Sequence, residues 1–534
     1  MATTVRLATA GDAPQWLDLV KSALGEEYLA REVYDPAWIA AQIDSTTGHE
    51  TWVAGSGRRL EASVSFLKPS GSDLNPIANL GRNLNTPESY ASGAARSLLE
   101  KVGELTSERR QMIVSRVPVS DHPQQSLLEE LGYHCVGFQP SKHMLRTRQG
   151  ILFYVKPSEP ILVTRSPLSE SLPQISGLAM MVLEKFGISS PLTVRDGATG
   201  YPLHTRLRVT EAGPEDYASW RDQAQASKSP VEVSGSFNLG SGLMRVTTHS
   251  PNRALLAERE GRVSAGLAFY MDEHDRCARI TDAFAMDDVS TGALLQHAVE
   301  VSQSQFGAVF VEVDVLMNAP RMLKSAEQLG FVPVGYLPAF YSRGGSYTDV
   351  VKLVKLNMAY AREQAPMTPE SRAIVELVDR NFDDQRVGLA IINLLRTLPI
   401  FEGLGDGELR RIARLFVQKL YRPGEVVFRK GDSGEEAYIV MRGQVDISID
   451  ENSKPIGTLT NGKIFGEQAF LDGAPRVAWA TATQPSILLV VQRTAMMDLI
   501  QREPHLGLVI MRNIALDLSA KLRHANANLA AMRR

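Results

Sequence analysis

A carboxylate and a guanidinium lie nine residues apart in the C-terminal part of the chain, at Glu467 and Arg476. A glutamate can accept hydrogen bonds from the hydroxyls of a sugar, and the planar fork of an arginine can hold two oxygens of a phosphate. Gly466 lets the backbone come close to such a ligand. This pair therefore indicates a site for a compact molecule that carries both a sugar and a phosphodiester.

The segment around this pair is predicted to form a strand, a short helix, a tight turn and a second strand. Further strand-like runs precede it at 424–428, 437–441 and 444–449, and glycines stand at the turns between them. Short, evenly spaced strands with glycine turns are typical of a small β-barrel. A surface Glu–Arg pair on a β-hairpin is the alternative that these two residues leave open.

The run from Phe465 to Ala478 resembles the phosphate-binding cassette of the cyclic nucleotide-binding domain family, whose pattern is Phe-Gly-Glu, a short apolar helix and Pro-Arg-x-Ala. The resemblance implies that a cyclic nucleotide contacts Phe465, Gly466, Glu467, Pro475, Arg476, Val477 and Ala478. Family members that select cGMP often carry a threonine directly after the arginine. Because Val477 stands there in this chain, we expect cAMP as the ligand.

Composition narrows the class of protein. A formal net charge of -3 argues against a nucleic-acid binder. The cassette is also similar to that of bacterial catabolite activators, but one more helical stretch is all that follows it in this sequence, so we do not expect a DNA-reading helix-turn-helix. The two cysteines lack metal-ligand spacing, so we expect no metal and a reducing compartment. Without an apolar signal region or an apolar run long enough for a bilayer, the predicted location is cytoplasmic, with no membrane span.

The first two thirds of the chain contain an internal repeat. Val5–Asp12 and Leu207–Pro214 both read as a strand leading into a helix, about 200 residues apart. Leu131-Gly132-Tyr133 is matched by Leu329-Gly330-Phe331, where a helix ends at a glycine and a strand follows. We therefore predict two α/β domains with mixed sheets in tandem before the barrel. The predicted segments are a first copy at 1–157, a connector with a helix at 158–203, a second copy at 204–358, a linker helix at 359–390 and the barrel with flanking helices at 391–534.

The opening strand and helix and the closing Leu-Gly-aromatic run of each copy resemble the GNAT superfamily of N-acetyltransferases. In that family the pyrophosphate of acyl-CoA rests on a loop of small residues at the start of a central helix. In the first copy Gly93 and Ala95 hold the small positions of this loop, and Tyr90 stands where the family usually has glutamine or arginine. The expected contacts are Gly93, Ala94, Ala95 and Arg96. The resemblance implies that acetyl-CoA or another acyl-CoA binds there. In the second copy Asp287 and Asp288 precede the helix, and their charge opposes a pyrophosphate.

The catalytic residues are less well defined. Many family members use a tyrosine as general acid five residues before the closing aromatic, but those positions are Leu128 and Ala326 here. Glu88, Asp282 and Tyr336 are the candidates for proton transfer. For each of them, an ordinary solvated or core-packed side chain is the favoured interpretation.

These features predict a cAMP-responsive, bacterial-type N-acyltransferase that moves an acyl group from acyl-CoA to an amine, such as a lysine of a protein substrate. The alternative is a non-catalytic, cAMP-sensing scaffold with degenerate acetyltransferase domains that binds a partner protein. The last helical stretch carries apolar residues close to a heptad rhythm, which favours a homo-oligomer. Packing of that helix on its own barrel is the other interpretation.

Overall fold

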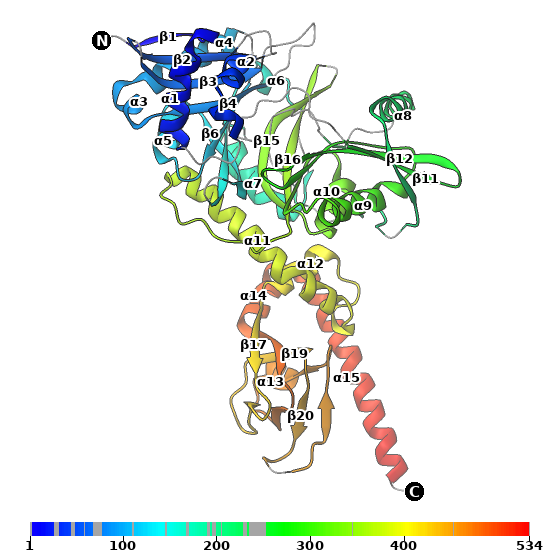
Figure 1. Cartoon of the computed structure of the whole chain (residues 1–534). Helices are drawn as coiled ribbons and strands as arrows, with labels where there is room; N and C mark the ends of the chain where they lie inside the picture. The colour runs from blue at the N-terminus through cyan, green and yellow to red at the C-terminus, as the bar shows by residue number, and fades with distance from the viewer. Residues whose placement is uncertain are drawn as a thin grey trace. The chain divides into compact units, whose positions relative to one another are not determined.

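The computed structural model describes residues 3–532, with gaps at 26–30, 44–48, 58, 68–76, 109–111, 145–146, 167–169, 189–192, 195–198, 204, 228–231, 234–252, 344 and 452 (Figure 1). The chain forms two compact units, Met1–Phe382 and Asp383–Arg534. Among the described residues, no helix is both long and apolar enough to cross a membrane.

A mixed sheet of 14 strands runs through the first unit. The strands of its first half are β1 (Thr4–Leu7), β2 (His49–Ser56), β3 (Arg59–Leu67), β4 (Ile77–Asn85), β5 (Met112–Pro118), β6 (His134–Met144) and β7 (Arg148–Lys156). Those of its second half are β10 (Arg208–Ala212), β11 (Arg253–Arg259), β12 (Arg262–Asp272), β13 (Cys277–Ala285), β14 (Phe310–Leu316), β15 (Val332–Arg343) and β16 (Ser346–Leu356).

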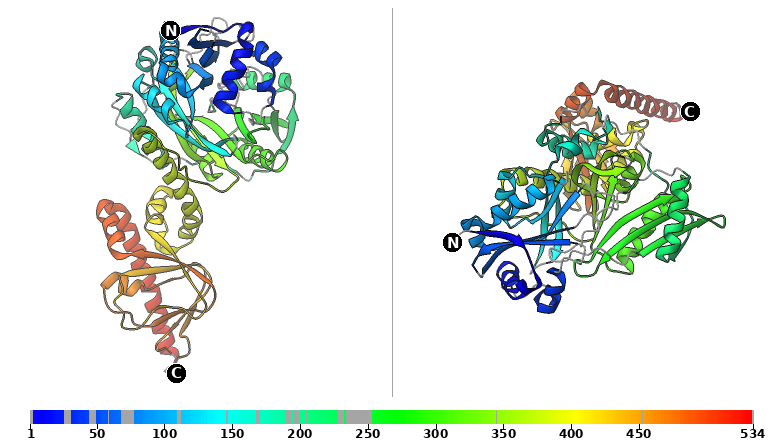
Figure 2. Two further views of the ribbon diagram at one scale, coloured as in Figure 1. Left: turned by 60° about the vertical axis from the view of Figure 1, so that its left-hand side comes forward. Right: turned by 90° about the horizontal axis from the view of Figure 1, so that it is seen from above.

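The two halves have the same strand order. From the outer edge inward, the first half reads β1-β2-β3-β4-β5-β7-β6 and the second reads β10-β11-β12-β13-β14-β16-β15. They meet between β6 and β15, where Gly137 pairs with Gly335. Figure 2 shows the halves side by side, the first in blue and cyan and the second in green. The prediction of mixed sheets is confirmed, whereas the segment limits drawn from the sequence stay predictions.

Helices pack against this sheet through amphipathic faces. In α4, Leu98, Leu99 and Val102 are buried, whereas Glu100 is exposed. The helices of the first half are η1 (Ala10–Asp12), α1 (Ala13–Leu24), η2 (Arg31–Tyr34), α2 (Pro36–Ile43), α3 (Pro87–Ser92), α4 (Ala94–Glu108) and α5 (His122–Glu130). The connector holds α6 (Glu159–Val163), α7 (Pro173–Lys185) and the short strands β8 (Glu170–Ser171) and β9 (Thr193–Val194). The second half holds α8 (Pro214–Ala226), α9 (Ser290–Ser304) and α10 (Pro320–Gln328).

In each half, one pair of parallel strands is hydrogen-bonded along only part of its length and then separates. β4 pairs with β5 only over Ile77–Leu80, and β13 pairs with β14 only over Cys277–Ile280, although both β4 and β13 continue for five residues more. In the second half, a short segment at Glu232 and Val233 pairs with β14 where β13 has separated from it. Val233 bridges to Val315 of β14, and the amide of Leu316 donates to the carbonyl oxygen of Glu232 at 2.9 Å. Because β16 takes the other edge of β14, this segment lies on the side from which β13 has parted.

Helix α11 (Pro369–Arg396) supplies residues to the cores of both units. Ile374, Val375, Val378 and Phe382 belong to the core of the first unit. Ile391, Ile392 and Leu395 belong to a core of the second. The predicted linker is therefore helical from Pro369 onward.

The second unit is a β-barrel flanked by helices, as predicted. One sheet has the order β17-β24-β19-β22 and the other β18-β23-β20-β21. The strands are β17 (Phe416–Tyr421), β18 (Val426–Phe428), β19 (Glu436–Arg442), β20 (Val445–Ser448), β21 (Gly457–Leu459), β22 (Ile464–Phe465), β23 (Trp479–Ala482) and β24 (Ser486–Gln492). The helices are η4 (Pro399–Phe401), α12 (Asp406–Ala413), α13 (Glu467–Asp472), α14 (Arg493–Arg502) and α15 (Pro504–Met532).

Two apolar cores form on opposite faces of β19 because side chains alternate along a strand. Tyr438 and Val440 point into the barrel, where they pack with Phe465. Ala437 and Ile439 point to the other face and pack in the core that contains the flanking helices. This alternation separates the inside of the barrel from the layer beneath the helices.

Candidate functional site

Arg476 is held inside the barrel by backbone carbonyl groups. It lies between α13 and β23 and is only 4% exposed. Its Nη1 donates to the carbonyl oxygen of Gly466 at 3.0 Å, and its Nη2 donates to that of Glu436 at 2.8 Å. Two aromatic rings flank the guanidinium, with Cζ 4.4 Å from the ring centre of Phe428 and 5.6 Å from that of Tyr438.

No carboxylate pairs with Arg476 among the residues that the structure describes. Its Nε is buried and has no hydrogen-bond partner there. Removing a charge from water is costly unless an opposite charge or several hydrogen bonds compensate it. The carbonyl dipoles and ring faces around Arg476 carry no full negative charge. The arrangement therefore presents a fixed cation that is suited to an anionic ligand.

Two glycines make room for this cation. A Cβ atom on Gly434 would lie 2.2 Å from Nε of Arg476, and one on Gly466 would lie 2.6 Å from Nη1. Gly466 also has a φ of 76°, in the left-handed region that favours glycine. Any side chain at either position would displace the guanidinium.

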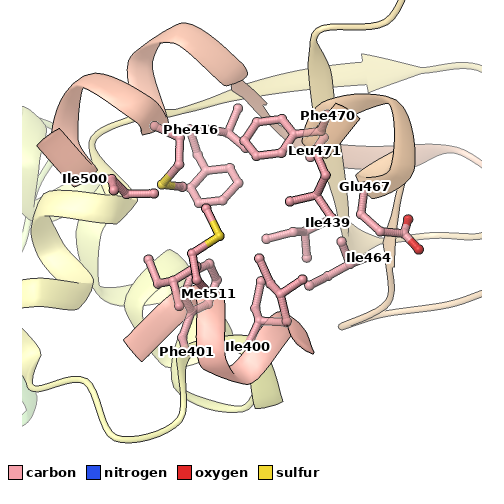
Figure 3. Close-up of a pocket in the computed structure, with 15 residues that line it drawn as sticks. Ile400, Phe401, Phe416, Ile439, Ile464, Glu467, Phe470, Leu471, Ile500 and Met511 are labelled. Carbon is pink, nitrogen blue, oxygen red and sulfur yellow. The ribbon is translucent and has the colours of Figure 1, made fainter. Parts of the chain in front are cut away.

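Glu467 is the first residue of α13 and follows Gly466 directly. Arg476 is hydrogen-bonded to the carbonyl group of Gly466, so the fold brings the two predicted residues to one peptide unit. Figure 3 shows the carboxylate of Glu467 turned away from a group of apolar side chains. It is thus oriented as a polar group at the rim of the cassette.

The other predicted cassette residues surround this pair. Phe465 is buried and stacks on Tyr438, with ring centres 5.1 Å apart. Pro475 is exposed, Val477 is 65% exposed, and Ala478 is half-buried. Sequence reasoning missed the contributions of Tyr438 and Phe428. Their sequence signal is weak, because an aromatic residue in an apolar strand is usually just core.

Tyr438 is itself fixed by a carboxylate. Its hydroxyl donates to Glu436, and burial raises the pKa of the phenol, with the hydrogen bond to Glu436 acting in the same direction. The phenol therefore stays protonated. Its ring is held against both Phe465 and the guanidinium of Arg476.

The residues predicted for acyl-CoA lie where α3 gives way to α4. Gly93 joins the two helices with a φ of 80°, and Ala94 and Ala95 are fully buried. Arg96 forms ion pairs with Glu130 and, at 3.9 Å, with Glu100. Ser92, directly before Gly93, donates a hydrogen bond to the buried carboxylate of Glu61 on β3. The acyl-CoA site therefore stays a prediction.

The three catalytic candidates have separate partners in the described structure. Glu88 lies on α3 and is 3.6 Å from Arg59. Asp282 lies on β13 and is 3.8 Å from Arg221, and burial raises its pKa above the ordinary range. Tyr336 is fully buried on β15 and donates to Asp349. No hydrogen bond or ion pair joins any two of the three candidates in the described part of the chain.

The start of α9 in the second half is occupied by an aspartate. Asp287 accepts from the amides of Val289 at 2.9 Å and Ser290 at 2.8 Å. Burial opposes ionisation of this carboxyl, but these hydrogen bonds and Arg259 outweigh it and hold its pKa below the usual value. The loop thus carries its own negative charge.

Comparison with known proteins finds one domain. Residues 418–503 match the family model of the cyclic nucleotide-binding domain. The region that resembles acetyltransferases matches no family model.

Relatives and solved structures match the same part of the chain. The chain is 31% identical over 134 residues to the cyclic AMP receptor protein of Thermus thermophilus, covering 24% of this chain and 60% of that protein. It is 32% identical over 143 residues to a cGMP-dependent protein kinase of Eimeria tenella, covering 27% of this chain and 13% of the kinase. The crystal structure of the Thermus thermophilus catabolite activator protein is 31% identical, covers 25% of this chain and 62% of its own, and has a TM-score of 0.23.

The chain thus spans less than two thirds of the length of these relatives. The matched segment contains β19, the cassette and Arg476. Residues 418–503 of this chain are therefore a cyclic nucleotide-binding domain.

Proposed function

We propose that this chain is a cAMP-responsive regulatory protein. The observation that carries the proposal is the buried guanidinium of Arg476, which lies within the matched domain and has no carboxylate partner among the described residues. The phosphodiester of a cyclic nucleotide supplies the missing negative charge. Glu467, one residue beyond the carbonyl group that Arg476 contacts, accepts from the ribose hydroxyl.

The choice of cAMP rests on Val477. Relatives named for cAMP and for cGMP both match this region, so their names do not decide between the ligands. Val477 directly follows Arg476 and offers no hydroxyl to the amino group of guanine. Adenine makes no such demand, so we assign cAMP.

We further propose acyl transfer as the activity of the first unit. The supporting observation is the parting of β4 from β5 beside the loop that contains Gly93. Such an opening suits a thioester arm that runs between two strands toward an amine. The amine nitrogen forms a bond to the acyl carbon, the carbon–sulfur bond breaks, and the thiol of CoA leaves with the proton. Only the first half takes acyl-CoA, because Val233 and Asp287 occupy the corresponding places in the second.

A second candidate function is a cAMP-sensing scaffold that binds a partner protein. The observation that favours it is the separation of Glu88, Asp282 and Tyr336, each engaged with a partner of its own. The engagement of Arg96 by Glu130 points the same way.

In either case α11 is the proposed route of regulation, because this one helix contributes to the cores of both units. The proposed homo-oligomer forms through α15. Its first half carries Leu508, which is 70% exposed, and Leu516, which is 56% exposed.

Isothermal titration with cAMP and, separately, with acetyl-CoA tests these proposals. We expect wild type to bind cAMP and Arg476→Ala to bind it weaker by roughly one to two orders of magnitude, since a charged hydrogen bond is lost. Unchanged affinity in a folded variant would refute the site. If cAMP binds but no acyl-CoA produces heat or a thermal shift, the scaffold replaces the transferase.

A further inference from the structure

An apolar pocket lies behind the cassette, on the opposite face of β19 from Arg476. Ala437 and Ile439 line it, whereas Tyr438 between them packs against the guanidinium inside the barrel. The pocket is therefore separated from the nucleotide site by the thickness of one strand. Helix α13 borders both places, with Glu467 at its start and Phe470 and Leu471 facing the pocket.

The lining of this pocket is predominantly apolar. Its volume is about 80 Å³. Figure 3 shows hydrocarbon and thioether side chains converging on it, and the carboxylate of Glu467 turned outward. Apart from Glu467, every lining residue is apolar: Ile400, Phe401, Phe416, Ala437, Ile439, Ile464, Phe470, Leu471, Val491, Met496, Ile500, Ile510, Met511 and Ile514.

This chemistry excludes the obvious polar occupants. A buried water needs about two to four polar partners, which the lining does not offer. An anionic nucleotide would find no cation among the lining residues. An apolar molecule gives up no hydrogen bond by entering, and dispersion contacts with packed side chains replace its contact with water.

We propose that this pocket is a second binding site, which takes a small apolar molecule or a short alkyl group. An apolar protein cavity of about 150 Å³ binds benzene, so a pocket of about half that volume suits a xenon atom or a chain of a few carbons. Met496 and Met511 line it with unbranched, adaptable side chains that adjust to the shape of such a guest.

Methyl NMR of the full-length protein labelled at methionine methyl groups tests the proposal, with xenon and n-butane as probes. Met496→Leu and Met511→Leu assign the two signals. We expect saturable shifts of both signals with either probe in wild type. The shifts should persist in Arg476→Ala, because that residue lies on the other face of β19.

A matched pair of variants fixes the location. Ile514→Phe places a larger ring in the pocket and should abolish the shifts, whereas Ile456→Phe, at a position that is 64% exposed, should retain them. Absence of saturable shifts at Met496 and Met511 in wild type would overturn the proposal without recourse to any variant. Shifts of equal size in a folded Ile514→Phe protein would overturn it as well.

Discussion

Gly137 and Gly335 face each other backbone to backbone where the two halves of the first unit join. A Cβ atom on Gly137 would lie 2.7 Å from Cα of Gly335 and 2.8 Å from the carbonyl oxygen of Val334. A Cβ atom on Gly335 would have more room, with its nearest neighbour at 3.3 Å. The junction is therefore sterically asymmetric although the strand order of the halves is the same.

This asymmetry predicts unequal costs for two identical substitutions. Gly137→Ala should lower the free energy of unfolding of the first unit by about 1–3 kcal/mol, because backbone atoms must move to admit the methyl group. Gly335→Ala should cost clearly less. Urea unfolding monitored by circular dichroism compares the two variants. Equal losses would show that the contact does not limit the approach of β6 and β15.

The repeat was visible in the sequence because both copies end with the same Leu-Gly-aromatic and Val-Gly pattern. That pattern contains Gly137 and Gly335 themselves. What it could not predict is that these glycines meet, since a period reveals equivalence but not the symmetry that relates the copies. The segment at Val233 is another example, because a single short bridge to Val315 has no periodicity that the sequence displays.

Gly434, which lies against the guanidinium of Arg476, allows a test of the nucleotide site that leaves the charged side chains in place. Gly434→Ala places a methyl group 2.2 Å from Nε of Arg476, and the guanidinium, as the end of a flexible side chain, moves instead of the backbone. We expect cAMP affinity to fall about 10-fold or more, with a melting temperature close to that of wild type. Isothermal titration and thermal melting measure both quantities.

Gly457→Ala is the matched control for this prediction. A Cβ atom there would meet no atom within 4 Å, and Gly457 lies on β21 of the same barrel. It should leave cAMP affinity unchanged. If Gly434→Ala and Gly457→Ala bind cAMP equally well, the position of the guanidinium does not matter for the ligand.

The cassette shows how far a local motif carries. The sequence alone placed Glu467 and Arg476 in one site, because both belong to one run with a recognisable pattern. Phe428 and Tyr438, which flank the guanidinium, and Gly434, which makes room for it, come from β18, β19 and the connection between them, outside the cassette. Their residue types are common in any β-barrel. The predictions of catalytic residues in the first unit depended on side chains such as Glu88 and Tyr336, whose surroundings only the fold defines.

Val477 offers a test of ligand choice. Val477→Thr replaces a methyl group by a hydroxyl at a site that is 65% exposed, so the fold should tolerate it. We expect cGMP to bind up to about 10-fold more tightly and cAMP affinity to change little, because one neutral hydrogen bond is added for guanine alone. Competition binding with both nucleotides measures the ratio. The same change at the exposed Val417 should leave the ratio unaltered, and an unaltered ratio in Val477→Thr would remove the basis for assigning cAMP.

Glu370 ties the start of α11 to the first half of the first unit. Its Oε1 accepts from the amide of Cys135 at 2.8 Å and lies 3.0 Å from Nζ of Lys185 and 3.5 Å from Nδ1 of His134. Burial alone would raise the pKa of this carboxyl, but His134 and the charge of Lys185 outweigh burial and hold the pKa below its ordinary value. The ionised carboxylate therefore stabilises the folded state above the unfolded pKa of about 4.3, and that contribution is lost as pH falls through the folded pKa.

Replacing the carboxylate of Glu370 should make the free energy of unfolding depend less on pH in the acid range. Glu370→Gln should lower the free energy of unfolding by about 1–2 kcal/mol at pH 7.5, and the difference from wild type should shrink below pH of about 4. Glu363→Gln is the control, because the pKa of Glu363 is shifted in the opposite direction. Burial and Asp379 outweigh the amide of Gly150 and raise the pKa of Glu363, so its ionisation opposes folding near neutral pH. That variant should be as stable as wild type or more so at pH 7.5.

Urea unfolding at pH 7.5 and at acid pH measures the free energy of unfolding of both variants and of wild type. If Glu370→Gln is less stable than wild type by the same amount at both pH values, the loss is due to packing instead of charge.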